Sequence, residues 1–366
     1  MPTARHTPTI AATCLLLLGG TLSVASESVE PVAPCCAAPG RFAHLVSATT
    51  PQPQIAVEES KHGLRVLING ELFAEYRTDN PHQPAIWPII GPSGHEMTRS
   101  YPLGPAREGE RKDHPHHESL WFAHGGVNGH DFWHIDTNRS SDQRPRIEHQ
   151  KVLAKGAASG EVSITTTNAW LAGDEVQLTD RRHVAFGVLP SDDGDDARYI
   201  DFTIELHASA GPVTFGDTKE GTFGIRVPGV MKADAGKGGR FFNNDAAESD
   251  AAWGQPAAWV AYEGPLEPAA EDADTPKGGI VIMSHPGSGG LPCRWHVRSY
   301  GLFAANPFGV IDFPHDESAT GGYELADGES LTLRYRVVLH AGASDPSGID
   351  AWYKDFAATD LTTTAE

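Results

Sequence analysis

The sequence predicts an all-β protein, a large antiparallel β-sandwich with a short C-terminal helix. Short segments rich in β-branched and aromatic residues recur along the chain, and Gly, Pro, Asp or Asn separate them. Asn69 and Gly70 lie between two such segments, which is the strongest local hairpin signal. Helical signals are confined to residues 347–356. Many short strands with few helices are typical of a sandwich.

The expected elements follow in order. Residues 64–68 and 71–76 should pair, because Asn-Gly readily takes the positive φ angles of a type I′ turn. The same composition predicts further strands at residues 161–167, 175–179, 182–188, 199–207, 222–227, 258–263, 279–283 and 331–340. Ser347 is expected to cap the C-terminal helix.

The N-terminal part of the chain carries a targeting pattern. In residues 1–25, Arg5 precedes an apolar run at 9–22, and small residues follow, as in a secretory signal peptide. We therefore expect export to the periplasm or the cell exterior. Residues 26–54 are rich in Pro, Ala, Ser and Thr and should form a flexible leader. Without a linker-like break, residues 55–366 should form a single β-sandwich domain.

Composition excludes two classes of partner. The chain has 48 Asp and Glu against 28 Lys and Arg, a formal charge of −20, which repels nucleic acid and anionic membranes. After the signal no apolar run approaches the length of a membrane span. Export removes Cys14, so a disulfide from Cys35 or Cys36 to Cys293 stays open. The cofactor, if any, is unknown from sequence, and a small-molecule or oligosaccharide ligand is expected.

A histidine cluster is the first candidate site. Six of the 18 histidines lie between His114 and His134. Histidine exchanges protons near neutral pH and ligates metals, and the aromatic Trp121 nearby could stack on a sugar ring. Three hypotheses stay open: proton transfer or sugar binding, a metal site, and a structural loop. Pro115 and the spacing match no closed zinc motif.

Two further segments place polar groups together. Asp217, Lys219 and Glu220 should lie at a sheet rim, and an acid beside a lysine is either a tuned base or an exposed ion pair. After Trp295, strand alternation should put His296, Arg298 and Tyr300 on one face.

These motifs resemble those of a family of exported bacterial proteins labelled PmoA-like or methane oxygenase. The likeness covers residues 55–342, and the segments that carry it are 101–105, 113–117 with 119–122, 127–129 with 131–133, 216–221, 295–298 and 306–309. The activity of that family is unestablished. A particulate methane monooxygenase subunit spans the membrane several times, which disfavours methane oxidation here.

The strand pattern is also similar to the large sandwiches of galactose mutarotases. In such enzymes a carboxylate takes the anomeric proton while a histidine protonates the ring oxygen. This resemblance implies Glu220 as base, with His117 or His296 as acid. We therefore expect carbohydrate epimerisation, elimination or hydrolysis, with a non-catalytic sugar-binding protein and a metal-dependent enzyme as alternatives. The expected catalytic residues are His116, His117, Glu220 and His296. The expected substrate-binding residues are Trp121, His124, Asn128, Asp217, Lys219, Arg226, Arg298, Tyr300 and Asn306.

Overall fold

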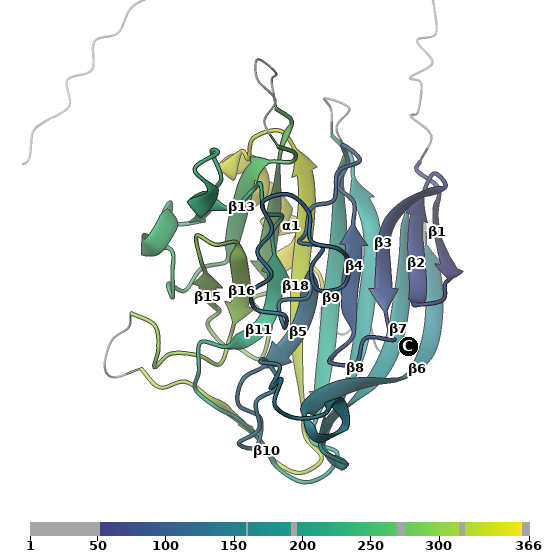
Figure 1. The fold of residues 1–366 in the computed structure, drawn as a ribbon, viewed down its shortest axis with the longest axis vertical. Helices are drawn as coiled ribbons and strands as arrows, with labels where there is room; N and C mark the ends of the chain where they lie inside the picture. Colours follow the sequence, from purple (N-terminus) through teal and green to yellow (C-terminus); the bar gives the residue numbers. More distant parts are fainter. Residues whose placement is uncertain (1–51, 159, 192–195, 269–274, 315–318, 361–366) are drawn as a thin grey trace, which may run out of the picture. The chain divides into compact units, whose positions relative to one another are not determined.

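The computed structural model describes residues 52–158, 160–191, 196–268, 275–314 and 319–360 (Figure 1). The expected signal peptide, and the expected leader up to residue 51, lie outside these ranges. Gln54 closes the leader and is held in place. Its N–H donates to Asn69 Oδ1 at 3.0 Å, and its carbonyl accepts from the Asn69 N–H at 2.7 Å. The flexible leader expected for residues 26–54 stays a prediction.

Two eight-stranded antiparallel sheets form the fold (Figure 1). Sheet 1 has the order β1 (Ile55–Glu59), β2 (Gly63–Ile68), β3 (Glu71–Arg77), β4 (Ala85–Ile89), β5 (Leu120–His124), β11 (Gly221–Arg226), β16 (Leu302–Asn306) and β15 (Arg294–Val297). Sheet 2 has the order β12 (Arg240–Asn243), β13 (Trp259–Pro265), β14 (Lys277–Ser284), β18 (Ser330–Ala341), β9 (Ala197–His207), β8 (Glu175–Leu189), β7 (Glu161–Ala172) and β6 (Pro145–Ala158).

Smaller elements complete the described chain. β10 (Val213–Phe215) and β17 (Tyr323–Leu325) make a two-stranded sheet, and α1 spans Pro346–Ala357. Three 3₁₀ turns are Ser141–Gln143, Ala233–Ala235 and Ser249–Ala251. Within the described ranges, no helix is long and apolar enough to cross a membrane.

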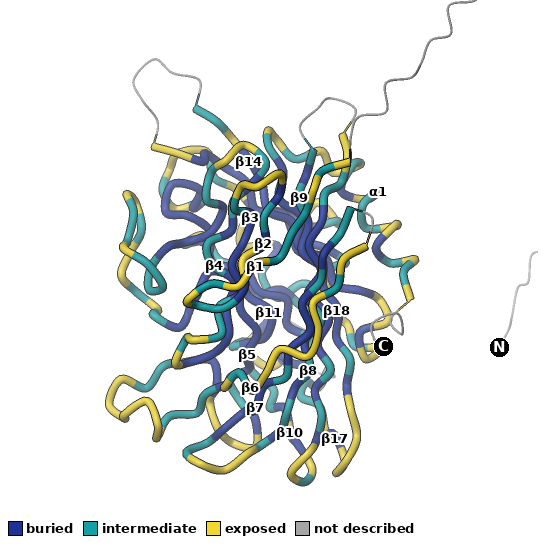
Figure 2. Tube along the Cα trace, turned by 90° about the vertical axis from the view of Figure 1, so that its right-hand side faces the viewer, coloured by how far each residue is buried: buried dark blue, intermediate teal, exposed yellow. Residues whose placement is uncertain are grey.

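The core lies between the two sheets. Phe122 of sheet 1 stacks on Phe202 of sheet 2 with ring centroids 6.3 Å apart, and Phe223 stacks on Tyr335 at 4.6 Å. β11 is buried along its whole length, whereas the edge strand β6 and the connecting loops carry most of the exposed positions (Figure 2). This packing confirms the predicted antiparallel β-sandwich.

The predicted hairpin forms as expected. β2 and β3 pair antiparallel, and Asn69 (φ 53°) and Gly70 (φ 82°) both take positive φ angles between them. Two other strand predictions need correction. Residues 175–179 and 182–188 are parts of one strand, β8. The strand expected through Tyr300 ends at Val297, because the Gly301 N–H donates to the Arg298 carbonyl in a tight turn.

The C-terminal helix covers the outer face of sheet 2. Ile349 and Phe356 pack in one buried cluster with residues of that face, among them Val338. The expectation that Ser347 caps this helix is wrong. The Asp345 side chain accepts hydrogen bonds from the N–H groups of Ser347 and Gly348, and Pro346 begins the helix. An acidic N-cap with proline behind it is the usual arrangement.

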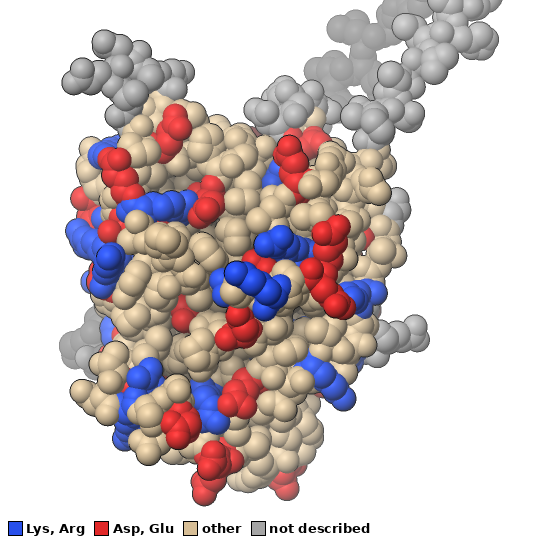
Figure 3. Space-filling view, turned by 45° about the vertical axis from the view of Figure 1, so that its right-hand side comes forward, with Lys and Arg blue, Asp and Glu red and all other residues tan. Residues whose placement is uncertain are grey.

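The surface shown carries charges of both signs, and one cysteine, Cys293, lies among the described residues. On the face shown in Figure 3, basic and acidic side chains are interspersed rather than gathered by sign. Cys293 is buried and forms no disulfide with another described residue. Cys35 and Cys36 lie outside the described residues, so the disulfide question stays open.

Candidate functional site

The candidate site lies on the outer face of sheet 1. Phe122 and Phe223 point between the sheets, so their neighbours Trp121 and Gly224, which face each other in register, point outward. A Cβ on Gly224 would lie 2.9 Å from the Trp121 ring. Glycine at this position therefore leaves room for the indole, which forms the floor of the site.

A stack of parallel rings stands on this floor. The His117 ring lies 5.3 Å from Trp121, His114 lies 4.8 Å from His117, and Tyr300 lies 5.4 Å from His114, with interplanar angles of 18°, 13° and 9°. Tyr300 comes from the turn after β15, and the histidines come from the segment 113–119 before β5. The stack thus joins segments that are far apart in the sequence.

Arg226 holds the stack to the sheet. It donates to Nδ1 of His117 at 2.8 Å and to Asp113 Oδ1 at 3.1 Å, and its guanidinium lies 4.6 Å from the centre of the Tyr300 ring. Arginine only donates hydrogen bonds, so Nδ1 of His117 accepts and the neutral ring carries its proton on Nε2. Burial, followed by the neighbouring His116 and Arg226, lowers the pKa of His117 well below its usual range.

A second arginine fixes the loop that carries the histidines. Arg99 donates to Asp113 Oδ1 at 2.9 Å, to the His114 carbonyl at 2.7 Å and to the His117 carbonyl at 2.9 Å. Burial alone would raise the pKa of Asp113, but the charges of Arg226, His114 and Arg99 lower it. The loop geometry is therefore set by a carboxylate shared between two buried guanidinium groups.

His116 and His134 form a contrasting pair. Their rings are 4.6 Å apart. Burial, with a contribution from His134, lowers the pKa of His116 to about 2, and its Nε2 finds no hydrogen-bond partner among the described residues. The hydrogen bond that Nδ1 of the half-exposed His134 donates to Asp131 Oδ2, at 2.8 Å, raises the pKa of His134. The His116 ring therefore stays neutral near pH 7, whereas the His134 ring takes up a proton more readily than an ordinary histidine.

A carboxylate group lies at the edge of the site. Glu220 pairs with Lys219 at 2.5 Å, and Nδ1 of His296 lies 4.0 Å from Glu220 Oε2. Burial lowers the pKa of His296 to about 4, and its Nδ1 has no hydrogen-bond partner in the described chain. Asp131 raises the pKa of His134, and burial raises the pKa of Tyr300. The negative charge of Glu220 adds to both increases. The three segments singled out in the sequence thus meet.

The residues that meet here include most of those predicted. Arg298 joins them through Tyr300, whose ring lies 6.0 Å from its guanidinium. Trp121 is only 1% exposed, covered by His117 and by Trp133 at 5.1 Å, so it supports a histidine rather than offering a face to a sugar. The members of the site that were predicted are His116, His117, Trp121, Lys219, Glu220, Arg226, His296, Arg298 and Tyr300.

Four predicted binding residues have structural roles instead. The Asp217 carboxylate accepts hydrogen bonds from the backbone N–H groups of Val310, Ile311 and Gly321. Asn306 donates to the Thr218 carbonyl and accepts from two N–H groups of the following turn.

His124 and Asn128 also make local structural contacts. The fully buried His124 ring lies against Phe308, and its Nε2 donates to the Gly216 carbonyl. Asn128 bonds Gln177 and the backbone of β10. Both side chains are committed to local contacts, which sequence spacing alone does not reveal.

Sequence reasoning missed the groups that position the histidines. Arg99, Asp113 and Asp131 were not singled out as site residues, nor was His134. The spacing of Asp131 and His134, three residues apart, could have indicated their pairing. Arg99 carried no such signal, because its partners lie 14 to 18 residues away on an irregular loop.

Metal ligation gains no support from this geometry. In the described ranges, no three side chains of His, Cys, Asp or Glu are grouped so that they could hold a metal ion. Within the cluster His114 stacks on His117, whereas His116 meets His117 and His134 edge to face.

Fold and site together define a two-sheet β-sandwich with a buried histidine layer on one outer face. Residues 63–354 match a family of unknown function, DUF6807, and the chain belongs to it. No curated protein has a sequence that matches this chain.

Among solved structures, the chain is similar to parts of larger carbohydrate enzymes. A glycoside hydrolase family 97 enzyme from Pseudoalteromonas sp. strain K8, in complex with panose, is 10% identical with a TM-score of 0.32, and the match covers 80% of this chain and 34% of that one. A polysaccharide lyase is 13% identical with a TM-score of 0.29, over 82% and 34%. The chain thus spans about a third of the length of these proteins.

Proposed function

We propose that this protein is a carbohydrate-active enzyme that carries out acid–base chemistry on a sugar. The observation that supports it is the meeting of Glu220, His296 and His134 around the stacked rings of sheet 1. Epimerisation, elimination and hydrolysis of sugars all need a group that takes a proton and a group that gives one.

The proton states assign these roles differently from the mutarotase resemblance. His117 and His296 have lowered pKa values and are neutral near pH 7, so they are poor acids. His134, whose pKa is raised through Asp131, is the better proton donor. Glu220 keeps the role of base, with Lys219 and His296 beside its two oxygen atoms.

The decisive experiment compares Glu220→Gln with the wild type on a panel of monosaccharides and oligosaccharides. We expect turnover to fall by about 100-fold or more, as for loss of a general base, while ligand binding stays within about twofold. Glu175→Gln, at an exposed position that begins β8 in the other sheet, is the matched control and should leave turnover unchanged.

Two outcomes would overturn the proposal. Saturable sugar binding without wild-type turnover on the whole panel would indicate a non-catalytic sugar-binding protein. Turnover that survives in Glu220→Gln would place the base elsewhere.

Export, which the PmoA-like resemblance also implies, is part of the same proposal. We propose that residues 1–25 are removed during export, on the pattern of Arg5 and the apolar run behind it. Intact mass of the protein purified from the periplasm should lack these 25 residues. Full-length protein confined to the cytoplasm would contradict export.

A further inference from the structure

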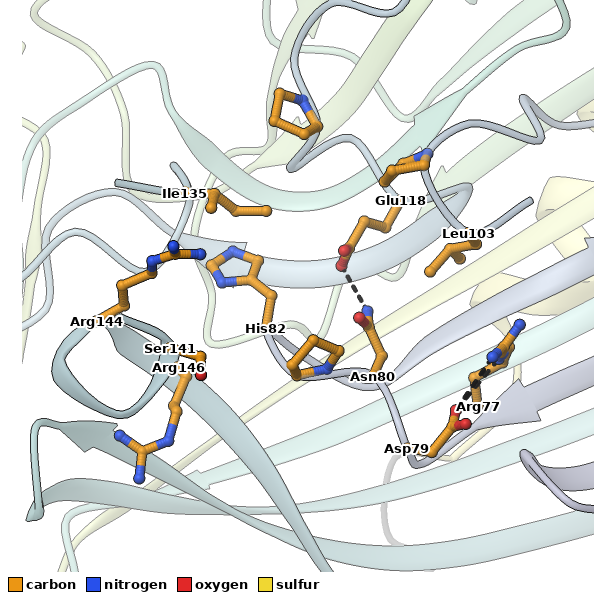
Figure 4. A pocket seen from close by; sticks show the side chains of 13 residues that line it. Arg77, Asp79, Asn80, His82, Leu103, Glu118, Ile135, Ser141, Arg144 and Arg146 are labelled. Carbon is orange, nitrogen blue, oxygen red and sulfur yellow. Dashed lines mark hydrogen bonds and ion pairs between the residues drawn. The ribbon is translucent and has the colours of Figure 1, made fainter. Parts of the chain in front are cut away.

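A pocket borders the histidine layer. It has a volume of about 440 Å³, and the same loop contributes to both places: Pro115 and Glu118 line the pocket, whereas His116 and His117 belong to the ring layer (Figure 4). The other walls come from the segment between β3 and β4 and from the start of β6. A volume of this size is typical of a small-molecule site.

The walls of the pocket carry an excess of positive charge. Arg77 pairs with Asp79 at 3.3 Å, and Arg146 pairs with Glu148 at 2.6 Å. Arg144 differs, because its Nε donates to the Arg139 carbonyl at 2.7 Å and no carboxylate in the described chain lies within ion-pair distance.

Among the three arginines that line the pocket, Arg77 and Arg146 are each paired with a carboxylate. Arg144 therefore supplies a positive charge in the lining that no ion pair in the described chain compensates. The pocket therefore favours an anionic ligand.

Two buried polar groups point into the pocket. His82 is 6% exposed, and its Nε2 has no hydrogen-bond partner among the described residues. Glu118 is 3% exposed and accepts from Asn80 at 2.7 Å through Oε2. In Figure 4, the Arg144 side chain lies beside the His82 ring, and the Glu118 carboxylate faces Asn80.

The protonation states define what these groups bind. Burial lowers the pKa of His82 to about 4 and raises that of Glu118 to about 8, so both are uncharged near pH 7. Nε2 of the neutral His82 ring has no partner in the described chain, so it can form a hydrogen bond with a ligand hydroxyl group. A buried polar atom without a hydrogen bond is costly, which favours a ligand that supplies this hydroxyl.

We propose that this pocket binds a hexuronate unit, a sugar that carries both hydroxyl groups and a carboxylate. Its carboxylate pairs with Arg144, and one of its hydroxyl groups forms a hydrogen bond with Nε2 of His82. Arginine suits a carboxylate because its N–H groups match both oxygen atoms. The assignment is a binding site and does not depend on the catalytic role of Glu220.

The test measures binding of D-galacturonate and D-glucuronate by calorimetry on the full chain. Galactose and glucose are the neutral matches, and sulfate tests the anion alone. Arg144→Gln should weaken hexuronate binding about tenfold or more through loss of the charge-assisted bonds. Arg139→Gln is the matched control, since it removes a charge from the same segment, where Arg139 pairs only with the exposed Asp136.

Support requires saturable binding of a hexuronate, at least about tenfold tighter than its neutral match, that is lost in Arg144→Gln and kept in Arg139→Gln. The proposal fails if wild type binds neither hexuronate, or if both variants bind equally. It also fails if sulfate binds as tightly as the hexuronates, because the hydroxyl contact to His82 would then contribute nothing.

Discussion

The neutral histidines limit which proton transfers the outer face of sheet 1 can support. His116, His117 and His296 are buried, and burial disfavours the charged imidazolium. His134 is the exception because a carboxylate lies beside it. Three histidines that stay neutral near pH 7 and one that is protonated more readily therefore lie in one layer, and each state is set by burial or by a hydrogen bond.

We predict that Asp131→Asn lowers the pKa of His134, measured by NMR titration of its ring. Asparagine keeps an oxygen that can accept from the Trp133 and His134 N–H groups, so the loop should keep its shape. Asp136→Asn, a nearby exposed acid, should leave the titration unchanged. An unchanged His134 pKa in Asp131→Asn would show that Asp131 does not control its proton.

The same substitution has a defined pH dependence for stability. A raised histidine pKa stabilises the fold fully below the unfolded value of about 6.5, and this contribution is lost as pH rises through the folded pKa. Asp131→Asn should therefore destabilise more at about pH 5 than at about pH 9, by less than about 1 kcal/mol because the pair is half exposed. Urea unfolding at the two pH values measures the difference.

Among the strands and the helix, those that depend on neighbouring residues alone could be predicted from the sequence. The β2–β3 hairpin was predictable because Asn69 and Gly70 determine the turn between adjacent strands. β5 was not predicted, since all five of its residues are buried and no alternation marks it. β15 was predicted too long, because the turn at Gly301 forms only when β16 pairs back on it.

Helix α1 gives a direct comparison of two caps. Asp345→Ala should lower Tm clearly, because its carboxylate accepts from two N–H groups, whereas Ser347→Ala should lower it less. The hydrogen bond from Ser347 lowers the pKa of Asp345, so its contribution is present above the unfolded pKa and lost as pH falls through the folded one. Melting curves that show a larger loss for Ser347→Ala would contradict this assignment.

At the scale of the whole molecule, the site depends on two sheets packed face to face. Aromatic residues of β5 and β11 that point into the core fix the opposite orientation of Trp121, Gly224 and Arg226. The residues packed on the inner face therefore determine which residues point outward, since successive strand residues alternate in direction.

Phe223→Ala tests this packing. Phe223 is fully buried and contacts both Phe202 and Tyr335, so its truncation should cost about 3–5 kcal/mol in unfolding free energy. Ile311→Ala, at a 65% exposed side chain, should change it by less than about 0.5 kcal/mol. Denaturant unfolding measures both, and a loss below about 1 kcal/mol for Phe223→Ala would indicate a loose core.

The all-β class, the hairpin, about half of the described strands and the density of histidines could be predicted from the sequence, because these depend on neighbouring residues. Which histidines stay neutral near pH 7, and which is protonated more readily, depends on tertiary contacts. The bond between Arg226 and His117 joins residues 109 positions apart, and burial of His116 follows from segments that are distant in the sequence. Sheet pairing and burial are long-range properties, so the site's protonation states could not be read from spacing.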